Sequence, residues 1–178
     1  IRIENASPLV RRCVLTNNFG STGISATGGF ASRLMTIGGA GAIGVEGGAP
    51  VFEECVIHGN QGGTGGSRIG GTSFVYAAIG GPGAVMVGSG SPIFRRCLIR
   101  QNIGGTGGLI TYGGTSSTTF GTVGPGGPGA ILSYGAVLVE NTAMILNTGG
   151  NAGLPAGPNQ QPSEVGAGGI RTYGTGPF

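Results

Sequence analysis

SPLVRRCVLTNN, from Ser7 to Asn18, is followed 42 residues later by APVFEECVIHGN, from Ala49, and after another 42 by SPIFRRCLIRQN, from Ser91. A degenerate fourth copy, AVLVENTAMILN, runs from Ala136 to Asn147. Glycine-led motifs precede the later copies: GAGAIGVEGG from Gly39, GPGAVMVGSG from Gly81 and GPGAILSYG from Gly127, while GAGGIRTYGTGPF from Gly166 begins a fifth. Repetition in phase predicts a solenoid, in which each unit buries its apolar side against the next.

Each unit is predicted to contain short strands whose alternate residues face inward. The inward positions of the twelve-residue motif are held first by Val10, Phe52 and Phe94, then by Cys13, Cys55 and Cys97, then by Leu15, Ile57 and Ile99. The three-residue step between the first two sets breaks strict alternation, which indicates a bend between two strands. We therefore predict an all-β fold, a right-handed parallel β-helix of about four coils in one domain, 1–178. The approximate repeats are 1–42, 43–84, 85–130 and 131–169, with a partial fifth at 170–178.

Two ladders of equivalent residues indicate stacking in register. Stacked asparagines can link their side-chain amides along the axis, and the motif ends in Asn18, Asn60, Asn102 and Asn147. The charged positions alternate in sign from coil to coil: Arg11 and Arg12, Glu53 and Glu54, Arg95 and Arg96, then Glu140. Like charges directly opposite one another destabilise a sheet, so a slip of one coil is disfavoured and the longer register is two coils.

Glycine accounts for 43 of the 178 residues. A collagen-like period of three does not run through the chain, and 38% hydrophobic with only 8% charged residues is not the composition of a disordered chain. Many glycines lie in four segments of about twenty residues: Phe19 to Gly38, Gln61 to Gly80, Ile103 to Gly124 and Thr148 to Gly166. Because Thr22, Thr64 and Thr106 recur in phase, we expect these long loops to stack into an ordered layer on one face.

The repeat pattern SPxFxxCxIxxN followed by a GGxGA-I strand resembles the parallel β-helix repeats of bacterial surface and secreted proteins in the pectate-lyase-like superfamily. The resemblance covers essentially the whole chain and implies the fold. It leaves the activity open, because that superfamily includes lyases, hydrolases, adhesins and passenger domains. The long glycine-rich segments depart from the usual form of the family.

The charged residues do not form the constellations that common chemistries require. All nine basic residues are arginine, all six acidic residues are glutamate, and the net charge is only +3. A nucleic-acid surface would need a clustered basic stripe, and no apolar run approaches the ~18 residues of a membrane span. Calcium would need six to eight oxygen ligands. We therefore expect no nucleic-acid partner, no membrane span, no metal and no cofactor.

Candidate catalytic residues also have simpler structural explanations. Glu53 and Glu54 are the only adjacent carboxylates, and both face arginines of neighbouring coils. His58 is the single histidine and aligns with outward polar positions, without a partner for acid–base work. Cys13, Cys55 and Cys97 are 42 residues apart, which fits no zinc motif, and stacked parallel side chains hold their Cβ atoms too far apart for a disulfide. We interpret the cysteines as buried free thiols that pack as small hydrophobes.

The predicted function follows from the repeat and its ends. Ile1-Arg2 matches Ile170-Arg171 in phase, and no polar capping repeat is evident at either end. We expect a non-enzymatic, extracellular or cell-surface structural solenoid, joined head to tail with further copies or with adjoining repeats of a longer chain. One alternative is an adhesin or glycan-binding passenger module that uses Tyr76, Tyr112 and Phe120 as surface contacts. A second alternative is a polysaccharide lyase or hydrolase. A flat threonine array for ice binding is disfavoured, since only one threonine per coil is in phase.

Overall fold

The computed structural model describes residues 1–27, 37–69, 78–111, 121–154 and 164–173. Within these ranges the regular elements are all strands, arranged in four sheets. Sheet 1 contains β1 (Arg2–Glu4), β5 (Ile43–Glu46), β9 (Val85–Ser89), β14 (Ile131–Ser133) and β17 (Ile170–Thr172). Sheet 2 contains β2 (Leu9–Arg11), β6 (Val51–Glu53), β10 (Ile93–Arg95) and β15 (Leu138–Glu140).

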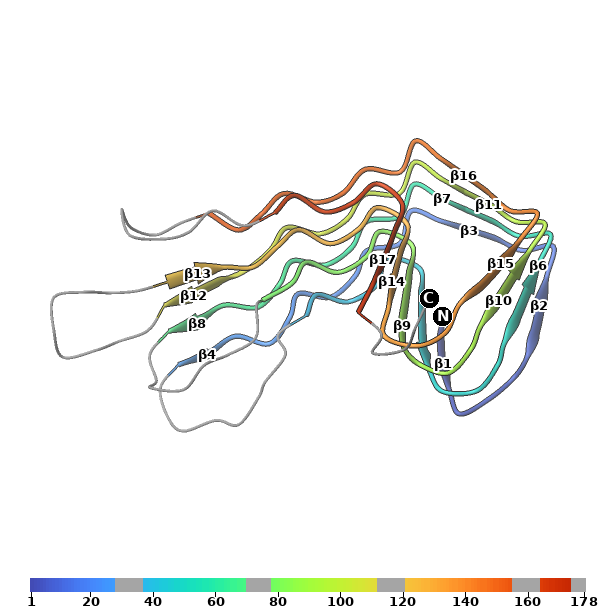
Figure 1. The fold of residues 1–178 in the computed structure, drawn as a ribbon, viewed down its shortest axis with the longest axis horizontal. Coiled ribbons are helices and arrows are strands. Elements are labelled where there is room, and N and C mark those ends of the chain that lie inside the picture. The colour runs from blue at the N-terminus through green and yellow to red at the C-terminus, as the bar shows by residue number, and fades with distance from the viewer. Residues whose placement is uncertain (28–36, 70–77, 112–120, 155–163, 174–178) are drawn as a thin grey trace, which may run out of the picture.

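Two further sheets complete the arrangement. Sheet 3 contains β3 (Val14–Thr16), β7 (Val56–His58), β11 (Leu98–Arg100) and β16 (Ala143–Ile145). The outer sheet contains β4 (Ala26–Thr27), β8 (Arg68–Ile69), β12 (Leu109–Thr111) and β13 (Gly121–Val123). Sheets 1, 2 and 3 surround a common core, and the outer sheet lies at the far end of a long extension (Figure 1).

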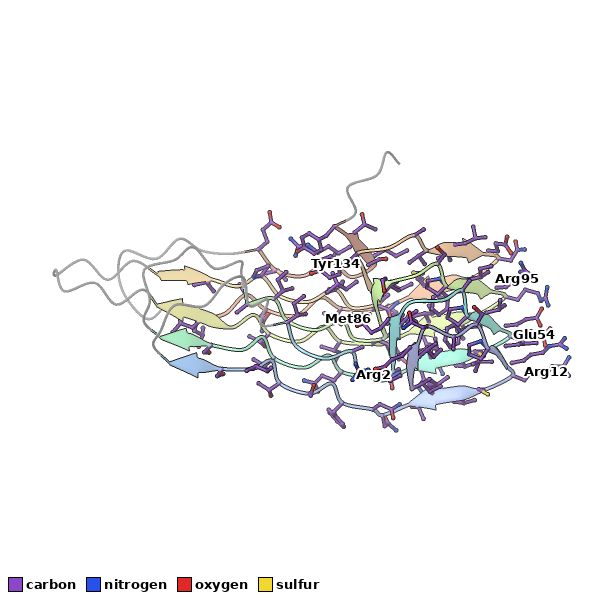
Figure 2. The ribbon with its side chains drawn as sticks, turned by 90° about the horizontal axis from the view of Figure 1, so that it is seen from below. Arg2, Arg12, Glu54, Met86, Arg95 and Tyr134 are labelled. Carbon is purple, nitrogen blue, oxygen red and sulfur yellow. The ribbon has the colours of Figure 1, made fainter. Side chains whose placement is uncertain are left out.

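Strands in sheets 1, 2 and 3 pair in parallel, each with the equivalent strand of the next coil, as the repeat predicted. Leu9 pairs with Val51, Val51 with Ile93, and Ile93 with Leu138. The successive coils are therefore stacked along one axis, which is visible from the side in Figure 2. This arrangement is that of a parallel β-solenoid. One turn through sheets 1, 2 and 3 is a single coil (the first coil, the fourth coil), and we use the coil, without a number, for the whole stack formed by these three sheets.

The core of the coil consists of the inward positions that the sequence predicted. Phe52 and Phe94 are fully buried and stack with ring centroids 4.9 Å apart and planes 7° from parallel. Ile57 and Ile99 are also fully buried. Val10, in the first coil, is only half-buried, because a residue of a terminal coil has a neighbour on one side only. Leu15 of the same coil is nonetheless buried, so stacking on one side is enough for some inward positions and stacking on both sides completes the burial of others.

The predicted bend separates sheet 2 from sheet 3. Arg12, Glu54, Arg96 and Asn141 lie there with left-handed φ values of 54°, 54°, 51° and 46°. A second bend, between sheet 3 and the extension, is made in the same way by Asn17, Gly59, Gln101 and Leu146. Since left-handed residues occupy the same position in every coil, each coil turns at the same place and the strands remain stacked.

The long glycine-rich segments form the extension, which we call the flange. In each coil the chain leaves through an outgoing segment and comes back through a return segment. The outgoing segments are 19–27, 61–69, 103–111 and 148–154, and the return segments are 37–42, 78–84, 121–130 and 164–169. The sequence predicted one stacked layer; the described residues form two, one of outgoing and one of return segments.

Hydrogen bonds in the flange follow a period of three residues. Gly20 and Gly23 donate to the carbonyls of Gln61 and Thr64, both at 2.8 Å, and Gly38 and Gly41 donate to Ile79 and Pro82, both at 3.0 Å. Three residues per turn is the period of a polyproline II helix, which has no internal hydrogen bonds and leaves its backbone groups free for neighbours. Further hydrogen bonds cross between the two layers and form a continuous series. In each of them an N–H donates to a carbonyl: Gly39 to Ser21, Gly63 to Gly39, Gly81 to Gly63, and Gly105 to Gly81.

Glycine is required in the flange because of space, not because of an unusual backbone conformation. None of the described flange glycines has a left-handed φ. A Cβ added to Gly105 would lie 1.9 Å from the carbonyl oxygen of Gly63, and one added to Gly63 would lie 1.9 Å from that of Ser21. Since the neighbour is backbone that is itself hydrogen-bonded, it cannot move aside. The glycines thus permit the close stacking of the layers.

Candidate functional site

Among the described residues there is no group of three or more histidine, cysteine, aspartate or glutamate side chains that could hold a metal ion. His58 is half-buried in sheet 3, and its Nδ1 lies 3.4 Å from the hydroxyl of Thr16. Glu53 and Glu54 are occupied by ion pairs with arginines. The residues that the structure does bring together form axial ladders, which connect one coil to the next.

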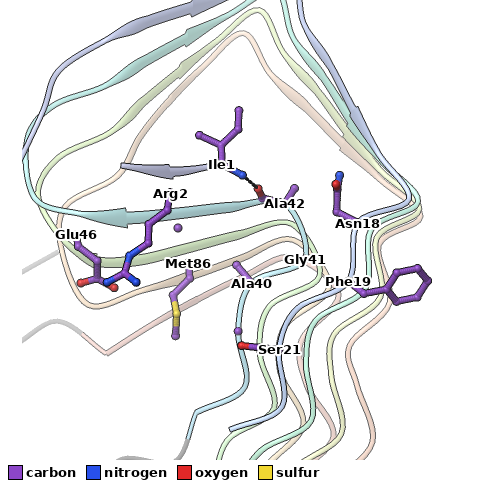
Figure 3. A pocket seen from close by; sticks show the side chains of 12 residues that line it. Ile1, Arg2, Asn18, Phe19, Ser21, Ala40, Gly41, Ala42, Glu46 and Met86 are labelled. Atoms are coloured by element: carbon purple, nitrogen blue, oxygen red, sulfur yellow. Dashed lines mark hydrogen bonds between the residues drawn. The ribbon is translucent and has the colours of Figure 1, made fainter. Parts of the chain in front are cut away.

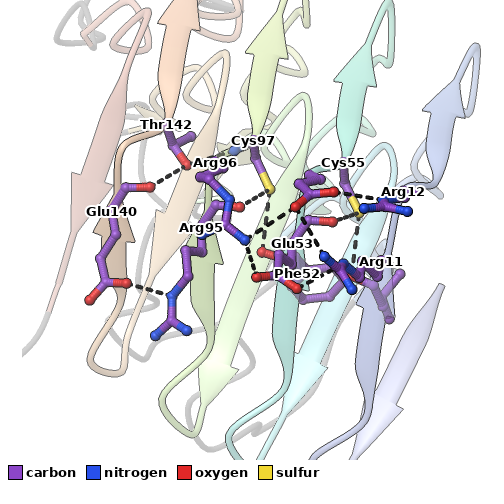
Figure 4. A network of polar contacts seen from close by, with 12 residues as sticks. Arg11, Arg12, Phe52, Glu53, Cys55, Arg95, Arg96, Cys97, Glu140 and Thr142 are labelled. Carbon is purple, nitrogen blue, oxygen red and sulfur yellow. Dashed lines mark hydrogen bonds and ion pairs between the residues drawn. The ribbon is translucent and has the colours of Figure 1, made fainter.

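The charge ladder runs along the bend between sheets 2 and 3 (Figure 4). Arg11 pairs with Glu53 at 3.0 Å, Arg12 with Glu54 at 2.7 Å, and Arg95 with Glu140 at 2.6 Å. Arg96 contacts both Glu53 and Glu54. The alternation of sign that the sequence predicted therefore becomes a network across all four coils. One detail was not predicted: Glu53 is bound by Arg96, not by Arg95, its partner in the strand register.

The network lowers the pKa of Glu54 to about 2, first through the hydrogen bond from Arg12 and then through that from Arg11. The same contact raises the pKa of Arg12. Both side chains remain partly exposed, at 29% for Glu54 and 70% for Arg12. Exposed pairs of this kind contribute little each, so the ladder favours one register more than it stabilises the fold.

The asparagine ladder is buried in its central part and runs in one direction. Asn18 donates from Nδ2 to Oδ1 of Asn60 at 2.8 Å, Asn60 to Asn102 at 2.9 Å, and Asn102 to Asn147 at 2.9 Å. Each Oδ1 of the last three also accepts the backbone N–H of the preceding member. The predicted ladder of Asn18, Asn60, Asn102 and Asn147 is thus a continuous chain in which each side-chain amide donates to the next asparagine. The amides of the last three also donate to carbonyls of the preceding coil.

The cysteine column packs partly as predicted. Cys55 and Cys97 are buried free thiols, and burial raises the pKa of the Cys97 thiol. Cys13 is exposed, contrary to the prediction, because no coil lies below it to cover its side chain. Each buried thiol also donates to a carbonyl of the preceding coil: Cys55 to Val10 at 3.4 Å and Cys97 to Phe52 at 3.3 Å.

Thr142 explains why the fourth copy can lack a cysteine. It occupies the same position, and its hydroxyl donates to the carbonyl of Phe94 at 3.2 Å. The column therefore requires a small side chain that can donate one hydrogen bond. This role of Thr142 was not evident from the sequence, which shows only that threonine replaces the cysteine of the other three copies.

The ladders end on two faces. The N-terminal face is the free side of the first coil and its flange segments; the C-terminal face is the free side of the fourth coil and its flange segments. The charge ladder presents Arg11 and Arg12 on the first face and Glu140 on the second. A cavity of about 610 Å³ opens beside β1 and the first return segment, and its lining extends along sheet 1 to Glu46 of β5 and Met86 of β9 (Figure 3).

The proposed surface contacts fall outside the described structure. Tyr76, Tyr112 and Phe120 all lie outside the described residues. Thr22 and Thr64 are exposed and Thr106 is half-buried, on the outer side of the outgoing layer. Phe19 starts the same layer with 75% of its surface exposed, and sequence reasoning had not selected it.

No helix in the described part of the chain is long and apolar enough to cross a membrane. Comparisons with protein-family models, with characterised proteins and with solved structures find no match for this chain. The axial ladders and the N-terminal and C-terminal faces are therefore the features of the described residues that bear on function.

Proposed function

We propose that this chain is a non-enzymatic structural solenoid, a right-handed parallel β-helix of the extracellular space or cell surface, that forms a segment of a longer axial fibre. The next coil along the axis belongs either to another copy or to adjoining repeats of the same chain. Such a module supplies length and stiffness, since its contacts between coils all run along one direction.

The observation that carries this proposal is the charge ladder and the way it ends. Its four coils alternate arginine, glutamate, arginine and glutamate, with pairs at 3.0, 2.7 and 2.6 Å. Because the number of coils is even, the two faces present opposite signs. A coil bearing Arg11 and Arg12 therefore continues the alternation when it stacks on the coil bearing Glu140. Complementary charges favour the correct register and disfavour others.

Electron microscopy and sedimentation of the native material that contains this chain test the proposal directly. We expect axial assemblies much longer than one molecule, with the width of a single coil and flange. Discrete compact particles at all concentrations would contradict it.

Charge reversal at one face separates the ladder's role in assembly from its role in the fold. Arg11 contacts both Glu53 and Glu54 and lies in the register position of Glu140. Arg11→Glu therefore places two carboxylates, its own and that of Glu140, on opposite sides of a junction, and we expect assembly to be reduced at least several-fold. Arg96→Glu is the matched control, because Arg96 also contacts Glu53 and Glu54 but lies inside the stack. Equal effects of the two variants would show that the ladder serves only the fold of one chain.

A glycan-binding adhesin is the second candidate, favoured by the exposed outer side of the outgoing layer. Thr22, Thr64 and Phe19 lie exposed there on a regular backbone. Binding of neutral polysaccharides to the intact chain, and its loss in Phe19→Ala, would support this function; unchanged binding in that variant would exclude this surface.

A further inference from the structure

The cavity on the N-terminal face follows the path of the return segments. Ile1, Ser21 and 40–42 are among the residues that line it (Figure 3). In the interior, the first residue of each strand of sheet 1 donates to the return segment of the next coil: Ile43 to Ala84 at 3.0 Å and Val85 to Ala130 at 2.9 Å. The amino group of Ile1 makes the equivalent bond to Ala42, at 2.7 Å. The part of the cavity beside Ile1, Ser21 and 40–42 is therefore the place where a return segment preceding the first coil would lie.

The hydrogen-bonding groups of the two faces are complementary. In the flange, two series of N–H groups donate toward the later coil, one in the outgoing segments and one in the return segments, as in the bonds from Gly107 to Asn151 and from Gly129 to Ala167. The next donors in the two series are the N–H groups of Ala152 and Gly168, which have no partner among the described residues. On the N-terminal face the corresponding acceptors are the carbonyls of Thr22 and Ala40, which also have none there.

The bonds between the two layers end in the same complementary way. Gly150 donates to the carbonyl of Gly127 at 2.8 Å, and Gly166 donates to Gly150 at 2.9 Å. The carbonyl of Gly166 is then the next acceptor of the series, and the N–H of Ser21 is the donor that would continue it. Neither has a hydrogen bond within the described residues.

We propose that this cavity binds the last return segment, 164–169, of a second copy of the chain, so that the flange continues across the junction. The inference rests on the proposed function and adds the partner segment and the register. Ala152 and Gly168 of one copy donate to Thr22 and Ala40 of the next, and Ser21 of the next copy donates back to Gly166.

The ladders of the coil fit the same register. Asn147 has a free backbone N–H among the described residues, and Oδ1 of Asn18 has no donor there. Stacking the two faces gives Asn147 the acceptor that every other member of the ladder has. It also places Cys13 over the carbonyl of Val139, as Cys55 lies over that of Val10, and covers the exposed thiol.

This register has one consequence that other contacts would not have. Sheet 1 contains five strands, whereas sheets 2 and 3 contain four each. When β2 of one copy stacks on β15 of another, β1 of the first copy and β17 of the second require the same position. Only one strand fits, so the other has to leave the sheet on assembly.

Ala152→Pro tests the junction. Proline suits a polyproline II segment and removes only the N–H group, and the N–H of Ala152 has no partner among the residues that the structure describes. The control is Ala167→Pro, because Pro82 and Pro128 hold the equivalent places of the return segments. We expect Ala152→Pro to weaken axial assembly about tenfold or more, since the Thr22 carbonyl would be left without a donor, and Ala167→Pro to assemble like the unmodified chain. Thermal unfolding below the assembly concentration checks that both variants fold.

Hydrogen exchange gives a second readout on the unmodified chain. On assembly the amides of Ala152 and Gly168 should be protected, and either Arg2–Glu4 or Ile170–Thr172 should lose protection. Axial fibres that form equally well with Ala152→Pro, or that protect both strands, would overturn the junction and leave the proposed function intact. Absence of any axial assembly by the unmodified 178-residue chain would overturn the junction between copies, and absence of long axial particles in the native material would overturn the proposed function as well.

Discussion

The coil and the flange stack along the same axis with the same period, yet different interactions stabilise them. In the coil, side chains such as Phe52 and Phe94 fill the space between the sheets and are completely buried. In the flange, the layers are so close that a Cβ at Gly105 would lie 1.9 Å from a carbonyl oxygen. The coil depends on the hydrophobic effect, and the flange depends on backbone hydrogen bonds at close approach. The comparison shows that one repeat can combine a side-chain core with a region whose closest contacts are between glycine backbones.

The largest expected effect is in the core of the coil. Phe94→Ala removes a ring that is fully buried and stacked 4.9 Å from Phe52, and we expect a loss of about 3–5 kcal/mol in the free energy of unfolding. Leu9→Ala, at a position 62% exposed on the outside of sheet 2, is the control and should cost far less. Chemical denaturation measures both, and similar losses would refute the assignment of the core.

The next effect distinguishes the flange from an ordinary loop. Gly105→Ala adds a single methyl group, yet its contact with the Gly63 carbonyl has no room to relax, and we expect a cost of about 3 kcal/mol. Gly169→Ala is matched to it, because a Cβ at that return-segment position meets nothing within 4 Å. Thermal unfolding compares the two. A Gly105→Ala variant as stable as Gly169→Ala would mean that the layers are not closely packed in solution.

The asparagine ladder lies at the boundary between the two regions, and its removal should cost less. Asn102→Ala leaves the N–H of Asn60 and the carbonyl of Ile57 buried without their partners, so we expect a loss of about 1–3 kcal/mol. Asn18→Ala, on the N-terminal face, should cost less because solvent reaches the groups it leaves. Equal losses in urea denaturation would argue against burial as the cause.

The smallest effect concerns the exposed charge ladder. The pKa of Glu54 is lowered from 4.5 to about 2 in the folded chain, so its contribution to stability is present above pH 4.5 and is lost as the pH falls toward 2. Melting temperatures measured across this range should decline more for the unmodified chain than for Glu54→Gln. Parallel curves would show that the arginines around Glu54 do not lower its pKa in solution.

Much of the coil could be predicted from the sequence because its repeat is visible in side chains. The inward positions, the bend after Arg12 and the asparagine ladder all follow from spacing and periodicity. The pairing of Arg96 with Glu53 could not be predicted, since it depends on how the left-handed bend directs each side chain. The role of Thr142 needed the structure for a similar reason, because only the stack shows which carbonyl its hydroxyl reaches.

The sequence by itself determined that the chain repeats, that strands stack in register, and that charges alternate along the axis. These are local or periodic properties, and the 42-residue spacing of the first three motif copies can be recognised directly in the sequence. Only the tertiary structure decided that the glycine-rich segments form two layers with a period of three, and that the two faces carry complementary groups. A glycine has no side chain to mark where it lies, so the packing of the flange becomes apparent only when neighbouring backbones are brought together.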